Sequence, residues 1–198
     1  MDIYEWYLNF FEMSSDKNIT EYIMLIIVSL MLLASAVSIV MWFLGKTNIS
    51  TMLTTVIVTA SYFSTDSILA LLFDYYETES FSGIATLYLI FTTFDAATVL
   101  AILLITPWFR KEGEKAIKTM TSLIALLLLI NATNNFVISL HIAINEEPNM
   151  IVYMMYSLII CLVDSSIVLV MFFPKKSESL VNWVLRRDSK QEITLVSG

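Results

Sequence analysis

The sequence predicts an all-α membrane protein with five transmembrane helices. Its hydrophobic content is 58% and its mean hydropathy is +0.77, whereas soluble domains are about 45–50% apolar. A helix needs about 20 mainly apolar residues to cross the hydrocarbon of a bilayer. Five stretches of the chain meet this length: 21–44, 51–73, 83–109, 118–141 and 150–173. Little chain is left for a soluble domain, so we assign residues 21–174 to one transmembrane bundle.

The charged residues fall in alternate connections and orient the chain. The N-terminal tail and the second and fourth connections carry a net charge of −9, while the first and third connections and the C-terminal tail carry +5. Three acids inside the spans complete the net charge of −7. Because Lys and Arg mark the cytoplasmic side, we place the N-terminus outside and the C-terminus in the cytoplasm. An odd number of spans agrees with ends on opposite faces.

Residues 1–20 are expected to form an amphipathic segment on the outer surface. Ile3, Trp6 and Phe10 recur at helical spacing, and Asp2 and Glu5 lie off that stripe, which suits a helix on a leaflet surface. Packing of the segment on the outer loops is the alternative. The stretch lacks the basic start and continuous apolar core of a signal peptide.

The first span is mostly Leu, Ile, Val and Met, with a patch of small residues from Ala34 to Ser38. Small residues let membrane helices approach closely. The patch is therefore expected to contact the other spans, and it is also a candidate contact in a homo-oligomer. A tight inner turn is expected over 45–50.

The remaining four spans form two hairpins that resemble each other. At a shift of 68 residues Asp66 aligns with Asn134, and at a shift of 69 Asp95 aligns with Asp164. The change of shift falls in the outer connections, where insertions cost little. We therefore predict a parallel two-hairpin repeat, because two-span units repeat in the same orientation about an axis along the membrane normal.

The most informative residues are three acids inside apolar spans: Asp66, Asp95 and Asp164. An aspartate at the centre of a spanning helix costs roughly 2.5–3.5 kcal/mol, so such residues usually face a bundle interior or a wet cavity. No Lys or Arg lies within their spans. Helical spacing places polar stripes beside them, with Tyr62 in the second span and Asn131 in the fourth. The predicted ion- or proton-binding residues are Asp66, Asp95, Asp164, Asn134, Asn135 and Thr92.

A buried acid without a basic neighbour can stay protonated, bind an ion, or pair with a base on another chain. Protonated acids would serve packing alone, whereas the surrounding oxygens also suit a hard cation such as Na⁺ or a proton relay. We expect a channel or transporter of cations or protons that uses this midplane cluster of aspartates. The alternative is a non-enzymatic sensor or anchor subunit that recruits a cytosolic effector or a partner membrane protein.

Enzyme classes find little support in the sequence. His141 and Cys161 are the single histidine and the single cysteine, so no metal set, Cys-His dyad or bis-histidine haem site can form. No glycine stands near the three acids, as an intramembrane aspartic protease would require, and the four glycines form no phosphate-binding loop. We expect no enzyme activity, no cofactor and no metal, and no nucleic acid as partner.

Residues 175–198 are expected to form a basic amphipathic tail in the cytoplasm. Apolar residues around Trp183 lead into Arg186, Arg187 and Lys190, which suits a helix on an anionic inner leaflet. Docking of a cytosolic partner is the alternative. We expect a homo-oligomer in the lipid bilayer, since five helices seldom enclose a path alone, and a location in a bacterial inner (plasma) membrane.

Overall fold

A computed structural model describes residues 19–75, 81–109, 118–145, 149–181 and 183. The predicted N-terminal segment and most of the C-terminal tail lie outside these residues. Within them every element is helical and no strand occurs, which confirms the all-α prediction. The elements are α2 (Ile19–Phe43), α3 (Ile49–Tyr75), α4 (Phe81–Ile105), the 3₁₀ helix η1 (Thr106–Phe109), α5 (Thr119–Ile144) and α6 (Met150–Phe172). Residues 174–181 form a further helical segment after α6.

Four helices are long and apolar enough to cross a membrane: those over Leu25–Phe43, Gly83–Phe109, Thr119–Ile144 and Ile151–Phe172. The fifth predicted span, α3, is one continuous helix of 27 residues, of which Ile49–Thr65, the stretch before the undescribed side chain of Asp66, is a shorter apolar helix. Several Thr and Ser residues lower the hydropathy of α3. Four candidate spans are therefore established by length and composition, and the fifth span and the orientation stay predictions.

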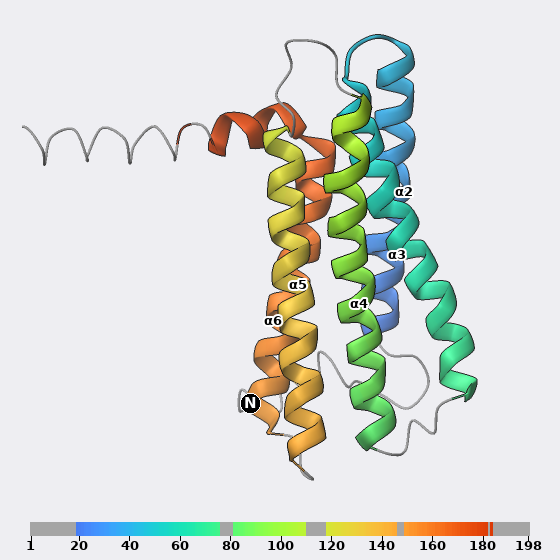
Figure 1. Ribbon diagram of the computed structural model, residues 1–198, viewed down its shortest axis with the longest axis vertical. Helices are drawn as coiled ribbons and strands as arrows, with labels where there is room; N and C mark the ends of the chain where they lie inside the picture. Colours follow the sequence, from blue (N-terminus) through green and yellow to red (C-terminus); the bar gives the residue numbers. More distant parts are fainter. Residues whose placement is uncertain (1–18, 76–80, 110–117, 146–148, 182, 184–198) are drawn as a thin grey trace, which may run out of the picture.

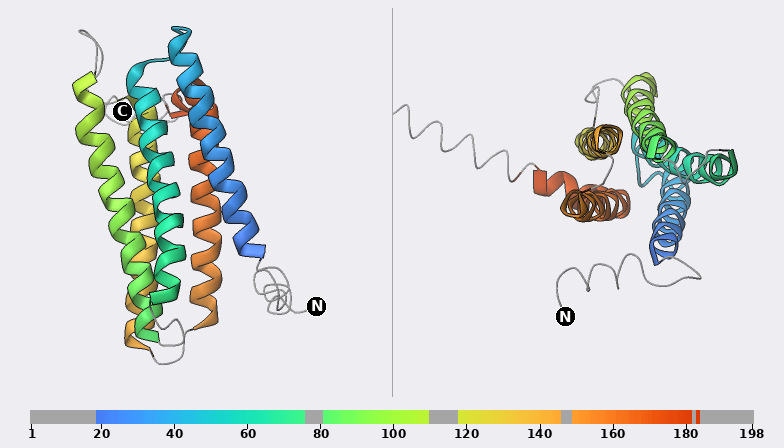
Figure 2. Two further views of the ribbon diagram at one scale, coloured as in Figure 1. Left: turned by 90° about the vertical axis from the view of Figure 1, so that its right-hand side faces the viewer. Right: turned by 90° about the horizontal axis from the view of Figure 1, so that it is seen from below.

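The helices stand side by side and alternate in direction (Figures 1 and 2). Each helix packs against the next one in the chain, and α6 packs back on α2, so the bundle closes on itself. α3 also contacts α5, and its C-terminal part leans away from the other helices (Figures 1 and 2). The α2–α3 turn, the start of α5 and segment 174–181 gather at one end of the bundle.

The α2–α3 turn follows from a single glycine. Gly45 has a φ of +69°, a left-handed conformation that favours glycine after a helix. The Gly45 N–H donates to the Trp42 carbonyl at 2.9 Å, and the Lys46 N–H donates to the Met41 carbonyl at 2.8 Å. These two hydrogen bonds satisfy the last carbonyls of α2 and place Lys46 at the end of the bundle.

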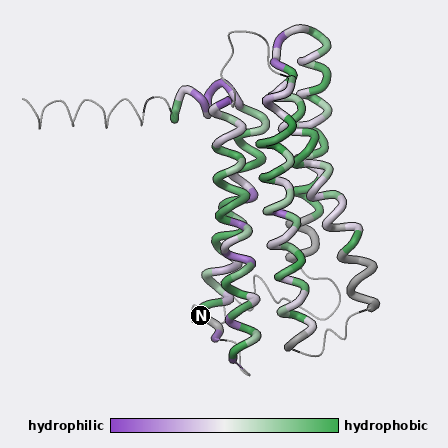
Figure 3. Tube along the Cα trace, viewed as in Figure 1, coloured by the Kyte–Doolittle hydropathy of each residue, from purple (hydrophilic) through white to green (hydrophobic). Residues whose placement is uncertain are grey.

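Large apolar side chains lie on both sides of each helix. The fully buried core contains Met31 of α2, Ile102 of α4 and Ile167 of α6. The opposite faces leave residues such as Leu104 and Leu162 exposed, at 65% and 59%. Figure 3 shows hydrophobic residues along most of the coloured trace, with hydrophilic residues gathered at one end of the bundle and a few within the helices. Such extensive exposed apolar surface fits a protein in contact with lipid.

Hydroxyl groups join the helices between the apolar layers. The Thr54 and Thr121 hydroxyls lie 2.9 Å apart and link α3 to α5. Thr59 donates to the Met31 carbonyl at 3.1 Å, and Ser139 donates to the Ala85 carbonyl at 2.7 Å. Hydrogen bonds of this kind help to hold membrane helices together.

The small residues of α2 pack mainly inside the chain. Ala34, Ser35 and Ser38 are 1%, 7% and 7% exposed, whereas Ala36 faces outward. The expected contact with the other spans is therefore present. It leaves little of this patch for a second copy of the chain.

Replacing Ile102 by alanine should destabilise the bundle by about 2–5 kcal/mol, because the side chain is fully buried and its removal leaves a cavity. Leu104→Ala, on the exposed face of the same helix, is the matched control and should change the stability little. Thermal unfolding of the purified protein in detergent micelles measures both variants. Equal loss of stability in the two variants would contradict this assignment of inner and outer faces.

Candidate functional site

A pocket of about 100 Å³ lies between the middles of the helices. Tyr62, Asp95 and Asn131 stand within two residues of the centres of α3, α4 and α5, and Asp164 stands three residues past the centre of α6. The pocket is lined by Val28, Tyr62, Thr65, Phe91, Asp95, Asn131, Asn135, Tyr156, Ile160 and Asp164. Two carboxyl groups, two amides and two phenols therefore meet near the middles of the helices, and no basic residue is present among the described lining residues.

Asp164 is the more deeply buried acid, with 1% of its surface exposed. Its Oδ1 accepts a hydrogen bond from the Tyr62 hydroxyl at 2.6 Å and another from Asn131 Nδ2 at 2.6 Å. Asn131 Nδ2 also donates to the Tyr62 hydroxyl oxygen at 3.1 Å. This triangle ties α3, α5 and α6 together, and its donors stabilise negative charge on the carboxyl group.

The other end of the Asn131 amide is unsatisfied. Its Oδ1 is buried and accepts no hydrogen bond; among the described residues Ser50 Oγ is the other buried side-chain atom in this state. If the Asn131 amide were flipped, its oxygen would take the place of Nδ2, 2.6 Å from Asp164 Oδ1. Two acceptors would then face each other whenever Asp164 is ionised. A buried acceptor without a donor costs about 1–3 kcal/mol. The Asn131 oxygen is therefore a buried acceptor, on a residue that lines the pocket, without a donor among the described residues.

Asp95 is half-buried and belongs to a second chain of hydrogen bonds. Its Oδ2 accepts from Asn135 Nδ2 at 3.1 Å, and Asn135 Oδ1 accepts from the Tyr156 hydroxyl at 2.9 Å. The Tyr156 ring meets the Tyr88 ring edge to face, with centroids 5.1 Å apart. This chain links α4, α5 and α6 on another wall of the same pocket.

Of the six predicted site residues, the structure brings Asp95, Asp164 and Asn135 to one pocket. Asn134 instead donates to the Tyr156 carbonyl at 3.2 Å. Thr92 faces two backbone carbonyls, those of Tyr88 at 3.0 Å and Ala132 at 3.3 Å. These two side chains hold helices together beside the pocket. Asp66 belongs to α3, and its side chain lies outside the part of the structure that is described.

Seven lining residues were not among the predicted site residues, and three of these, Tyr62, Asn131 and Tyr156, form hydrogen bonds with the acids or amides of the site. The first two stand in the polar stripes of their helices, one turn from Asp66 and Asn135 respectively. Tyr156 stands eight residues before Asp164, on the same helical face, and that spacing was the available signal. Because tyrosine rings are largely apolar, the sequence did not show that the hydroxyl groups of Tyr62 and Tyr156 would take part in the site.

The donor set limits the chemistry of this site. In the described ranges, no group of three or more His, Cys, Asp or Glu residues could hold a metal ion. The pocket offers instead two carboxyl groups with amide and phenol oxygens, a set that suits a hard monovalent cation or a proton more than a transition metal.

The fold and the site define a class: an all-helical protein whose apolar helices are compatible with an integral membrane protein, with an acidic pocket inside the bundle. No family model, no curated protein and no solved structure matches this chain.

Proposed function

We propose that the chain is an integral membrane channel or transporter that handles cations or protons in the pocket between Asp95 and Asp164. The observation that carries the proposal is a pocket at mid-helix depth whose described lining has two carboxyl groups and no basic residue, beside the unpartnered Asn131 oxygen. A cation in the pocket would compensate the carboxylates of Asp95 and Asp164. Protons moving between the two acids would use the same donors and acceptors.

The size of the pocket favours this proposal over a packing role. A water molecule needs at least about 10–15 Å³ of such space, so about 100 Å³ holds several waters or a partly hydrated ion. Acids retained for packing alone would be expected to close around one another. Buried carboxyl groups beside open polar space are typical of ion and proton pathways.

The proposal includes five spans, with the N-terminus outside and the C-terminus in the cytoplasm. α3 has 27 residues and at 1.5 Å per residue is about 40 Å long, which exceeds a hydrocarbon core of about 30 Å. The parallel repeat is supported by the helix starts, since α6 begins 69 residues after α4 and α5 begins 70 residues after α3. The charge asymmetry supports the orientation, and we propose a bacterial inner membrane as the location.

We also propose a homo-oligomer, since the pocket is lined by residues near the middles of the helices and five helices seldom enclose a path alone. The outward faces of the helices supply apolar surface for a second copy. Small shifts between copies would then open the pocket to both sides.

The topology is tested by cysteine labelling in a Cys161→Ser background. A cysteine at Ser80 should react with an impermeant reagent from outside, and one at Thr47 should react only after permeabilisation. A reporter fused after Gly198 should read as cytoplasmic. Labelling of the Ser80 variant only after permeabilisation would contradict the five-span arrangement.

The function is tested by ion flux through purified protein in liposomes. The intact protein should pass Na⁺, K⁺ or H⁺ under an imposed potential. Absence of flux for all three ions, at every pH and with or without a potential, would remove transport from consideration.

A second candidate function is a non-enzymatic sensor or anchor subunit. Leu180 and Trp183, exposed at 64% and 60%, lie at the end where lysines gather and would suit a docked cytosolic partner. Asp95, being half-buried, could instead pair with a base on a partner membrane helix. Pull-down of a partner that depends on Asp95 and Asp164, together with absence of flux, would favour this class.

A further inference from the structure

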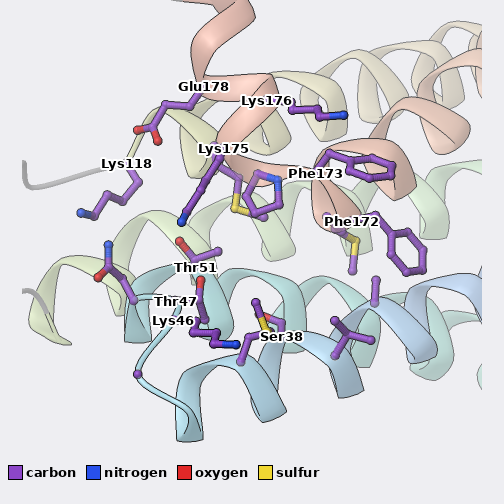
Figure 4. Close-up of a pocket in the computed structure, with 18 residues that line it drawn as sticks. Ser38, Lys46, Thr47, Thr51, Lys118, Phe172, Phe173, Lys175, Lys176 and Glu178 are labelled. Carbon is purple, nitrogen blue, oxygen red and sulfur yellow. The ribbon is translucent and has the colours of Figure 1, made fainter.

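A second cavity, of about 540 Å³, lies at the end of the bundle formed by the α2–α3 turn, and its lining includes neither Asp95 nor Asp164. Its walls come from the end of α2, the α2–α3 turn, the start of α5 and the segment after α6. Figure 4 shows Lys175 extending from that segment toward Thr51 on the facing wall. Elements that are distant in the sequence therefore enclose one space.

The basic residues of the described structure gather in this cavity. Its lining includes Lys46, Lys118, Lys175 and Lys176, which are all the Lys and Arg residues in the described ranges, against one acid, Glu178. They come from three separate connections of the chain. Among the described lining residues four lysines stand against one carboxylate, a charge balance that favours an anion with several acceptor oxygens.

The deep part of the cavity is apolar. Ala34, Met120 and Met171 form its floor and are 1%, 2% and 3% exposed. On one side the lining includes Val37 and Met41, which are 45% and 36% exposed on the outer face of α2. The cavity therefore opens sideways onto the apolar surface that would face lipid, as well as toward the end of the bundle.

We propose that this cavity binds the phosphate-bearing headgroup of an anionic phospholipid from the leaflet at the basic end of the bundle. The lysines bind the phosphate, with Thr51 and Thr47 available as hydroxyl donors. The acyl chains leave past Val37 and Met41 into the bilayer. Basic pockets between transmembrane helices on the cytoplasmic side recognise headgroups in this way.

The shape of the cavity argues for a lipid rather than a soluble phosphate. A soluble anion needs only the polar mouth, whereas this cavity continues into an apolar floor and a lateral opening. Its volume falls in the range of small-ligand pockets, about 300–1,000 Å³, enough for a headgroup but not for two acyl chains. The Lys176 ammonium also lies 5.4 Å from the centre of the exposed Phe173 ring, an arrangement suited to the membrane interface.

The test is native mass spectrometry of the purified full-length protein in detergent, titrated with phosphatidylglycerol. Lys46→Gln/Lys175→Gln should weaken phosphatidylglycerol binding about tenfold to thirtyfold, since each lysine near an anionic surface contributes a factor of about five. Arg187→Gln/Lys190→Gln removes the same charge from the sequence after residue 183 and should change binding less than about twofold. Lys46→Arg/Lys175→Arg should retain binding. Both lysines are exposed, so thermal unfolding without lipid should be alike in all variants.

Three results would overturn the proposal. If both glutamine double variants weakened phosphatidylglycerol binding equally, the lipid would be attracted by the overall charge of the protein and not by this cavity. Equal binding of phosphatidylcholine and phosphatidylglycerol would show that the negative charge is not recognised. Displacement of the lipid by millimolar glycerol phosphate, with binding of that compound at the same affinity, would assign the cavity to a soluble phosphate.

Discussion

Replacing Asp95 and Asp164 together by asparagine is expected to reduce Na⁺ or K⁺ flux more than about tenfold and to remove its pH dependence. Asparagine keeps the shape and most hydrogen bonds of the two side chains but removes the charge. A loss of ~1.4 kcal/mol of ion stabilisation already corresponds to a factor of ten. In the intact protein, flux of these ions should fall on acidification, because a protonated carboxyl group cannot compensate a cation. Flux into liposomes at a series of pH values measures both effects.

Single substitutions of the three acids test whether the repeat correctly identifies the equivalent site residues. The repeat predicts similar effects for Asp95→Asn and Asp164→Asn, and a milder effect for Asp66→Asn because its counterpart is already Asn134. Asp66→Asn is therefore the matched control, with the same loss of charge on a neighbouring helix. Abolition of flux by Asp66→Asn alone, with the other two variants silent, would show that the repeat misidentifies the site.

Much of the fold could be predicted from the sequence because long apolar windows leave little choice of structure. The helices begin and end within a few residues of the predicted spans. Polar stripes also identified the helical faces that form the pocket. Asp95 and Asp164 were identifiable because a carboxyl group in an apolar window is costly wherever the helix is rotated.

The sequence could not determine which polar groups meet. Thr92 and Asn134 share the polar region, yet both bind backbone carbonyls, since helix rotation and packing decide which stripe member reaches the pocket. The lysine cavity was equally hidden. The charge pattern placed Lys46, Lys118 and Lys175 at one end, but their convergence on one cavity depends on how α2, α5 and α6 pack.

The Val28→Lys variant is expected to fold and to reduce ion flux by more than about tenfold. Val28 lies in α2, is 8% exposed and lines the pocket with Asp95 and Asp164. A lysine there would place a permanent cation in the pocket, where the two carboxylates can pair with it. The tethered ammonium would then occupy the position that the transported ion needs.

Val28→Lys should destabilise the protein when Asp95 and Asp164 are absent. Combined with Asp95→Asn/Asp164→Asn, Val28→Lys leaves a buried charge without a partner, which costs about 3–5 kcal/mol. Val28→Met, with a long side chain and no charge, is the control and should have the same effect on stability in both backgrounds. Thermal unfolding in detergent micelles gives the comparison. If Val28→Lys destabilised the protein equally with and without the acids, they would not compensate a cation in this pocket, and a packing role would explain them better.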